Sequence, residues 1–350
     1  MKATYKKYVL DFKRPSGTSR GTLTKKETWF IIMQDGEDVG IGECGILRGL
    51  SIDDRDDYEK YLKWGVDNIH LGLDKLLERL VGFPSIQFGL EQAFLSLRSR
   101  NPFILFPSDF THKEIPIEIN GLIWMGSEDF MLQQIEDKLL QGFKCLKMKI
   151  GAIDFDAELK LLNAIRNRFS KDEIELRVDA NGAFSVENAL EKLRMLSTYD
   201  LHSIEQPIKP RNWTKMKELC QRSPLPIALD EELIGVSDLT KKSDVLETIR
   251  PQYIILKPSL VGGFKSSKEW INLAEGFGVG WWVTSALESN IGLNSIAQWT
   301  FTLNNQMPQG LGTGSLYTNN FESPLAVAEG NLFYRNELSW QQDLIEDLCI

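Results

Sequence analysis

The sequence predicts an α+β module followed by a parallel α/β barrel. Three observations lead to this fold class. Roughly the first 105 residues read as strands followed by helices. From residue 115 onward, strand-like and helix-like stretches alternate, as they do in parallel barrels. Five of these strand-like stretches end in charged residues, spaced by roughly 25–30 residues, which is the length of one strand–helix unit.

The chain is expected to begin with three strands. Residues 5–12 and 27–33 are rich in β-forming side chains, and a turn at residues 35–38 leads into a return strand at 39–44. Residues 14–26 contain Pro15 and two glycines and are expected to form a mobile loop.

A second loop is expected at residues 45–53, and helices from residue 54 to about 100. Leucines at positions 73, 76, 77 and 80 follow the helical period, and residues 87–100 form another amphipathic run.

Regular alternation begins at residue 115. Ser127 is expected to cap the first barrel helix, which Gly142 would end. The expected strands are residues 115–121, 143–150, 174–179, 201–205, 227–230, 253–257, 281–284 and 310–311. The expected helices are residues 127–141, 155–169, 186–196, 213–222, 237–242, 266–277 and 287–302.

Composition narrows the function classes. A net charge of -9 argues against nucleic acid as the main partner. No apolar run approaches the ~20 residues of a membrane span, and the N-terminus lacks the apolar core of a secretory signal. The 4 cysteines are scattered, which indicates reduced thiols and a cytoplasmic protein.

A lysine pair ends the second expected barrel strand. Lys147 and Lys149 are two residues apart, so both point to one face, while Leu146, Met148 and Ile150 point to the other. In a barrel, the lysine face would be the interior. Buried lysines lose protons readily, which suits a general base. The competing explanation is an exposed strand edge with solvated lysines.

Three carboxylates end the next three strands. Asp179, Glu205 and Asp230 are expected at the carboxyl ends of successive strands, where barrel active sites are built. Converging carboxylates repel one another unless a cation lies between them, and oxygen-only ligands suit Mg²⁺ or Mn²⁺. Each acid alone would be ordinary as a helix cap. Glu231 and Glu232 directly follow Asp230, so one of them could be the third metal ligand in its place.

Lys257 ends the following strand, opposite Lys149 across a barrel. A lysine that extends into solvent is the alternative. The loop after it ends in Gly262 and Gly263, which would let the backbone approach a ligand closely. The 3 histidines lie outside the strand ends, so a histidine-based mechanism is not expected.

The ordered set of motifs resembles the enolase superfamily. The matching stretches are K-M-K at 147–149, D-A-N-G at 179–182, E-Q-P at 205–207, A-L-D-E at 228–231 and L-K-P at 256–258. The resemblance implies an α+β capping domain at residues 1–110 and a modified TIM barrel, (β/α)₇β, at 111–325. Residues 326–350 would pack back on the cap.

The lysine pattern is similar to the muconate-cycloisomerase-like subgroup. Within it, residues 40–51 and 284–289 look most like the o-succinylbenzoate synthase family, whose members are lyases of menaquinone biosynthesis. N-acylamino acid racemase, dipeptide epimerase and muconate cycloisomerase are the alternatives. Residues 309–314 contain no acid, unlike the D-x-D of dipeptide epimerases. A barrel that binds without catalysis would be expected to have lost one of the five catalytic positions.

The resemblance also implies roles. A small-molecule carboxylate would bind a Mg²⁺ held by the three acids, with Mn²⁺ as a substitute. Lys149 would be the base, assisted by the charge of Lys147. Lys257 would be either a cation that stabilises the intermediate or a second acid/base. A homo-oligomer is possible within this pattern. The expected substrate-binding residues are Asn181, Gly262, Ser285, Glu288, Arg20 and Arg48.

Overall fold

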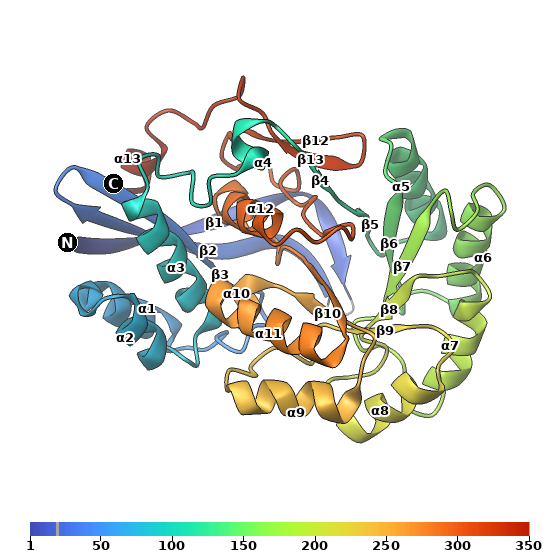
Figure 1. The fold of residues 1–350 in the computed structure, drawn as a ribbon. Coiled ribbons are helices and arrows are strands. Elements are labelled where there is room, and N and C mark those ends of the chain that lie inside the picture. The colour runs from blue at the N-terminus through green and yellow to red at the C-terminus, as the bar shows by residue number, and fades with distance from the viewer. Residues whose placement is uncertain (19–20, 350) are drawn as a thin grey trace.

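A computed structural model describes residues 1–18 and 21–349 of the chain. An antiparallel sheet with helices on one side lies beside a parallel sheet that curls into a barrel (Figure 1). Helices α5 to α8 lie along the outer side of the parallel sheet, while the last part of the chain returns to the antiparallel sheet. The predicted fold class is therefore confirmed.

The antiparallel sheet has the order β1 (Lys2–Thr18), β2 (Gly21–Asp35), β3 (Asp38–Gly45). The helices that follow are α1 (Tyr58–Asp67), a 3₁₀ turn (Ile69–Leu71), α2 (Leu73–Arg79) and α3 (Pro84–Arg98). Alternate residues of β2, including Trp29 and Ile31, form a core with these helices. Gly42 lets α3 approach closely, because a Cβ there would lie 1.9 Å from the Gly89 oxygen.

The loop expected at residues 14–26 was wrong within the described residues. β1 continues to Thr18 and β2 begins at Gly21. Their pairing shifts register between Asp11 and Ser16, and this irregularity accommodates Pro15, which has no N–H for a ladder bond. The far end of the hairpin reaches the barrel, where Gly17 bridges Met125. Residues 45–53 do form the expected loop from Ile46 onward.

The parallel sheet has the order β11-β10-β9-β8-β7-β6-β5. Its strands are β5 (Gly121–Ile123), β6 (Cys145–Lys149), β7 (Glu175–Asp179), β8 (Ser203–Glu205), β9 (Ile227–Leu229), β10 (Tyr253–Leu256) and β11 (Gly280–Val283). The helices between and after them are α5 (Glu128–Leu140), α6 (Phe155–Arg166), α7 (Ala189–Ser197), α8 (Trp213–Arg222), α9 (Leu239–Ile249), α10 (Pro258–Val261), α11 (Gly263–Phe277) and α12 (Asn290–Thr302). Ser127 caps α5 as expected, since its hydroxyl accepts the Phe130 N–H.

Two residues close the barrel in place of a full eighth strand. Gln309 forms a parallel bridge with Ile119, and Gly310 forms one with Thr284, beyond the end of β11. The strand expected at residues 310–311 is therefore limited to these isolated bridges. The Gln309 side chain strengthens the closure, because its Oε1 accepts the Val283 N–H at 2.8 Å.

Other element boundaries also differ from expectation, including the following three. Residues 115–121 do not form one barrel strand, because β4 (Ile117–Glu118) pairs with another sheet and the barrel begins at β5. The helix expected at 237–242 is α9, which starts later and runs further. The glycine loop after Lys257 is instead the short helix α10, and Gly262, with φ +101°, joins it to α11.

The C-terminal part returns to the cap. β12 (Leu325–Ala328) and β13 (Asn331–Tyr334) form a small sheet with β4, and α13 (Leu344–Cys349) contacts β1 and β2. Leu344 and Leu348 are buried against Phe30 and Ile32.

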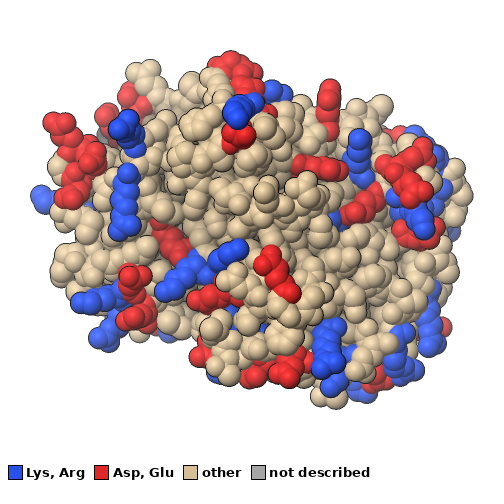
Figure 2. Space-filling model, in the orientation of Figure 1, with Lys and Arg blue, Asp and Glu red and all other residues tan. Residues whose placement is uncertain are grey.

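The helices of the described chain include none long and apolar enough to cross a membrane. On the face drawn in Figure 2, cationic and anionic side chains are interspersed around an uncharged central area.

Candidate active site

A cavity of about 240 Å³ lies at the carboxyl ends of the barrel strands. Lys147, Lys149 and Lys257 line it together with Asp179, the only carboxylate among its described lining residues. Lys138 also lines it, so four lysines face this space. Such a cavity favours an anionic ligand.

The lysine pair enters the barrel through the alternation of β6. Leu146 and Met148 belong to the core between the sheet and its helices, whereas Lys147 and Lys149 face the interior. Both lysines are buried, with 5% and 9% exposure. The prediction that they share the inner face is confirmed.

The three predicted acids lie on adjacent strands. Asp179 and Glu205 are the last residues of β7 and β8, and Asp230 directly follows β9. The register places Lys149 opposite Asp179 and Asp179 opposite Glu205. All three carboxylates are at most 2% exposed. Parallel pairing therefore brings together side chains that are far apart in the sequence.

Lysine amines lie between these carboxylates. Lys147 Nζ is 2.5 Å from Glu205 Oε2 and 3.3 Å from Asp179 Oδ2. Lys257 pairs with Asp230 and lies 3.7 Å from Glu205 Oε1. Lys149 donates to Asp179 at 3.1 Å and to Asn181 Oδ1 at 2.7 Å. Three cations thus neutralise three anions in a buried cluster.

The pKa values reflect this arrangement. Burial and the neighbouring Asp179 charge raise the pKa of Glu205 to about 7. Burial by itself would raise the pKa of Asp179. The ammonium groups of Lys149, Lys147 and Lys257 outweigh this effect and lower the pKa. Burial acts downward on the pKa of Lys257, yet the carboxylates of Asp230 and Glu205 raise it overall.

The donor set fits a divalent cation. Glu205 Oε1 is buried and accepts no hydrogen bond, so it has an unused lone pair directed into the cluster. Carboxylate oxygens are the ligands that Mg²⁺ and Mn²⁺ prefer. As they stand, no three His, Cys, Asp or Glu side chains in the described part of the chain are grouped to hold a metal. The acids are held apart because a lysine amine lies between each neighbouring pair of them: Lys147 between Asp179 and Glu205, and Lys257 between Glu205 and Asp230.

The two acids after Asp230 have other partners. Glu232 Oε1 accepts from the Arg211 N–H at 2.7 Å and from Trp213 Nε1 at 2.8 Å. Glu231 accepts from Asn181 Nδ2 at 3.0 Å. Asp230 pairs with Lys257 and so belongs to the cluster.

Of the six expected substrate-binding residues, two line the cavity, three do not, and one lies outside the described residues. Asn181 and Ser285 line it. Asn181 has φ +43° and bonds to both Lys149 and Glu231, so it orients the lysine. Glu288 is fully buried and is absent from the cavity lining, because its carboxylate binds the hydroxyls of Ser259 and Ser285 instead.

Gly262 and Arg48 lie away from the cavity. Gly262 lines a separate cavity of about 170 Å³ between the cap and α11, which corrects its expected place at the substrate. Arg48 is exposed and pairs with Glu27 and with Asp54. It is tied to the cap loop in this structure and does not line the cavity. Arg20 lies outside the described residues.

The apolar wall of the cavity was not predicted. Its members are hydrophobic residues from β2, the loop after β3, β5 and the residue that follows it, and the loops after β11 and α12. They are Leu23, Leu47, Leu50, Leu122, Trp124, Leu287 and Leu316. None of them was a predicted site residue, because only the folded chain brings them to one wall.

The fold and the site together define a barrel enzyme of the enolase type, with a capping domain over acids and lysines at the strand ends. The chain belongs to the enolase superfamily, and residues 131–336 match the family described as Enolase C-terminal domain-like. Enzymes of this superfamily use a lysine or histidine base together with divalent metal ions.

Individual proteins of this superfamily are similar to the chain over most of its length. The chain is 49% identical to the o-succinylbenzoate synthase of Desulfotalea psychrophila, over 95% of this chain and 98% of that protein. The crystal structure of MenC from the same organism superposes with a TM-score of 0.84, at 45% identity over 95% of this chain and 99% of the other. Muconate lactonizing enzyme from Pseudomonas fluorescens superposes with a TM-score of 0.81 over 99% and 98% of the chains, and at 21% identity it shows the shared fold.

Proposed function

We propose that the chain is a lyase that catalyses the o-succinylbenzoate synthase reaction. In it, 2-succinyl-6-hydroxy-2,4-cyclohexadiene-1-carboxylate loses a proton next to its carboxylate and then its hydroxyl group, which together leave as one water and give an aromatic ring. The observation that carries the proposal is the similarity to a synthase at 49% identity over almost the full length of both chains. The lysine-lined cavity supports an anionic substrate of this kind.

The metal is proposed to be Mg²⁺, with Mn²⁺ as a substitute, held by Asp179, Glu205 and Asp230. When bound, this cation would supply Lewis-acid stabilisation of the negative charge that develops on the substrate carboxylate.

Lys149 is the proposed base. In its amine form it takes the proton from the carbon next to the carboxylate, and as an ammonium it returns that proton to the departing hydroxyl, which leaves as water. Asn181 Oδ1, at 2.7 Å from Lys149 Nζ, would keep the amine directed into the cavity. Lys147 would add positive charge next to the developing anion.

Lys257 is proposed to remain an ammonium. Its raised pKa, which comes from Asp230 and Glu205, favours a cation over a base on that side of the substrate. Loss of water needs only one proton-transferring residue, because the ring becomes aromatic without inversion. The apolar wall would hold the ring and exclude water.

Racemisation of N-succinylamino acids is the second candidate. It is favoured by the presence of a lysine on each side of the acids, Lys149 and Lys257. The chain is 26% identical to the N-succinylamino acid racemase of an Amycolatopsis species, over 79% of this chain and 76% of that protein. A dipeptide substrate is less well matched, because its ammonium group would meet four lysines and one carboxylate.

One assay separates these functions. The purified chain is given the cyclohexadiene substrate with Mg²⁺, and the fall in absorbance on aromatisation is followed. Parallel reactions contain N-succinylamino acids and L-Ala-L-Glu in D₂O, and exchange of the α-proton is measured. Aromatisation is expected. Its absence, together with α-proton exchange in a panel compound, would replace the synthase proposal with the racemase or epimerase. Residence in the cytoplasm and assembly as a homo-oligomer remain proposals that fractionation and light scattering would test.

A further inference from the structure

Leu287 lies on the cavity wall in a conformation that leucine rarely adopts. Its φ is +64°, and it lines the cavity with Ser285 and Ala286. A left-handed bulky residue persists only where its surroundings hold it. Two bonds hold its backbone directly: Ser285 Oγ accepts the Leu287 N–H at 3.0 Å, and the Tyr317 hydroxyl donates to the Leu287 oxygen at 2.7 Å.

Glu288 holds this wall from behind. Its Oε2 accepts the Ser285 hydroxyl at 2.6 Å, and its Oε1 accepts the Ser259 hydroxyl at 2.6 Å. Ser259 lies two residues after Lys257, on α10. The carboxylate therefore ties the loop after β11 to the segment that carries a lysine of the charge cluster. Glu288 is fully buried and does not line the cavity, so it acts through Ser285.

A second carboxylate reaches the same loop from the capping domain. Glu43 of β3 accepts the Ser289 N–H at 2.9 Å, the Ser289 hydroxyl at 2.5 Å and the Gly292 N–H at 2.9 Å. It also accepts the Thr28 hydroxyl at 2.9 Å. Glu43 thus binds the first turn of α12, where an anion is favoured, and fixes that turn to the antiparallel sheet.

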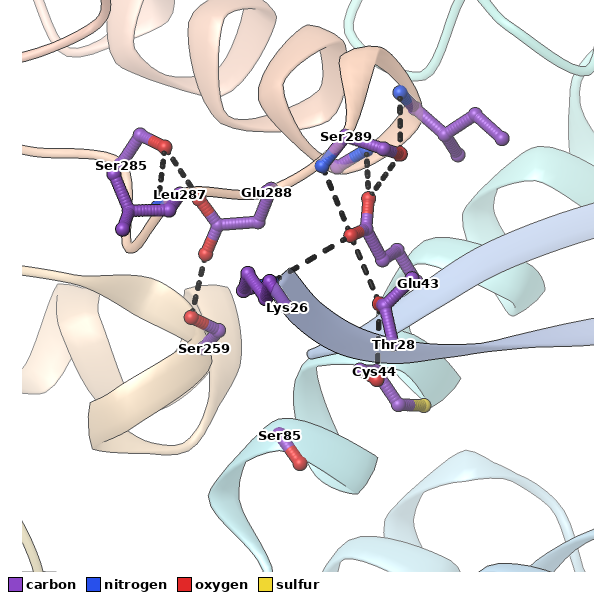
Figure 3. A network of polar contacts seen from close by, with 12 residues as sticks. Lys26, Thr28, Glu43, Cys44, Ser85, Ser259, Ser285, Leu287, Glu288 and Ser289 are labelled. Atoms are coloured by element: carbon purple, nitrogen blue, oxygen red, sulfur yellow. Dashed lines mark hydrogen bonds and ion pairs between the residues drawn. The ribbon is translucent and has the colours of Figure 1, made fainter. Parts of the chain in front are cut away.

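A buried lysine lies next to Glu43. Figure 3 shows Lys26 joined to Glu43, which also binds Ser289, the residue after Glu288. Its side chain is 2% exposed, its Nζ makes no hydrogen bond, and the Glu43 Oε1 atom is 3.9 Å away. Gly45 makes the space, because a Cβ there would lie 2.4 Å from Nζ. A buried ammonium needs an anion near it, and Glu43, which also holds the first turn of α12, supplies that anion.

We propose that Lys26, Glu43 and Glu288 form a latch that positions the wall at residues 285–287 against the non-reacting part of the substrate. Glu288 is a positioning residue for substrate specificity, and the cap contributes through Lys26 and Glu43. The inference rests on the proposed function for the identity of the substrate. The wall follows β11, which does not neighbour the Lys149 strand β6 in the sheet, so the latch is expected to govern binding of the succinylated ring and to leave the proton transfer unaffected.

The test compares two buried carboxylates at the same cap–barrel interface. Glu288→Met has a side chain of similar length but removes both hydrogen-bond acceptors. Glu91→Met is the matched control, because Glu91 of α3 accepts the Phe264 and Lys265 N–H groups of α11 and is remote from the cavity lining. For each variant, KM and kcat of aromatisation and the affinity for o-succinylbenzoate in the presence of Mg²⁺ are measured.

Glu288→Met is expected to raise KM and weaken product binding by about 10-fold each, with kcat within about threefold, because a lost binding interaction that does not change in the reaction affects KM alone. Glu288→Gln, which can still bond both hydroxyls, should restore KM to within about threefold. Glu91→Met should lower stability and leave KM unchanged. Wild-type KM and product affinity in folded Glu288→Met, or an equal rise in Glu91→Met, would overturn the latch.

Hydrogen exchange tests the latch without substrate. The amides of residues 285–289 should exchange faster in Glu288→Met than in the wild type, and unchanged exchange there would contradict the proposal. If Glu288→Met does not fold, Ser259→Ala removes one of the two bonds and should raise KM by about threefold; an unchanged KM in that variant would count against the latch. A wild type that neither aromatises the substrate nor binds the product, but shows the expected exchange, would refute the proposed function and leave the latch standing.

Discussion

Lys147 Nζ lies 2.5 Å from Glu205 Oε2, inside a barrel where both side chains are buried. The pair joins β6 to β8 across β7, whose Asp179 lies 3.3 Å from the same amine. Lys257 makes a corresponding contact with Asp230 and Glu205, so a lysine amine lies next to each of the three acids. A cation that binds the acids must therefore compete with these amines, which links metal binding to the direction of the lysine side chains.

The base assignment predicts the effect of Lys149→Ala. Turnover should fall by about 10²–10⁴-fold, which is the usual contribution of a positioned general base. Folding and Mg²⁺ binding should persist, because the three acids are unchanged. Steady-state kinetics of aromatisation would be combined with circular dichroism and a Mg²⁺ titration. Activity close to that of the wild type would exclude Lys149 as the base.

Metal removal should abolish activity and lower thermal stability. EDTA is expected to eliminate turnover, and Mg²⁺ at about 100 times its dissociation constant should stabilise the fold by about 2.7 kcal/mol. Differential scanning fluorimetry measures the change in Tm.

Two neighbouring variants test which acid holds the metal. Asp230→Asn should lose the Mg²⁺-dependent rise in Tm, whereas Glu231→Gln should keep it, because Glu231 bonds to Asn181. The reverse result would move the third ligand to Glu231.

Asp53 should make stability pH-dependent. Burial raises its pKa to about 6, although Ser85 donates two hydrogen bonds to Oδ2. The unfolded chain then releases this proton first as pH rises, so the folded state binds more protons between about pH 4 and 6. The contribution of Asp53 to stability therefore falls with rising pH, by at most about 3 kcal/mol, and stays constant above pH 6.

Urea unfolding at pH 4 to 7 measures this effect as the difference between wild type and Asp53→Asn. The free energy of unfolding of the variant should increase relative to that of the wild type as pH rises. Asp54→Asn is the control: burial acts to raise the pKa of Asp54, but the Gly49 N–H and Arg48 lower it overall, so the difference for this variant should change little above pH 4 and in the opposite direction. A pH-independent difference for Asp53→Asn would refute the prediction.

Barrel closure depends on one amide side chain. Gln309 is fully buried, accepts the Val283 N–H at 2.8 Å and donates to the Met307 oxygen at 2.5 Å. Gln309→Ala should reduce the free energy of unfolding by about 2–4 kcal/mol, since it leaves buried backbone groups unpaired. Gln306→Ala, at an exposed glutamine nearby, should change it by less than about 0.5 kcal/mol. Equal effects of the two variants in urea unfolding would contradict a role in closure.

The alternating pattern of the barrel half was enough to predict most of its elements. Strand-ending charges at Asp179, Glu205 and Lys257 lie at the expected strand ends, because a residue that follows a buried parallel strand emerges at one edge of the sheet. The inward direction of Lys147 and Lys149 follows from the two-residue period of a strand. These features are local, so the sequence is sufficient for them. The catalytic and metal-binding roles of these residues remain predictions.

Tertiary contacts decided the rest. The β1–β2 hairpin continues through Pro15 because pairing across a register shift compensates for the missing N–H. Gln309 and Gly310 close the barrel through contacts with Ile119 and Thr284, which no local pattern encodes.

The same division applies to the site. The motifs at the strand ends determined that acids and lysines would gather at one edge of the barrel. Only the folded chain decided that Gly262 lies outside the cavity, that Glu288 acts from behind its wall, and that Lys26 is buried next to Glu43. The physical reason is that these placements depend on how the capping domain packs on the barrel, where residues as far apart in the sequence as Glu43 and Gly292, 249 positions, meet.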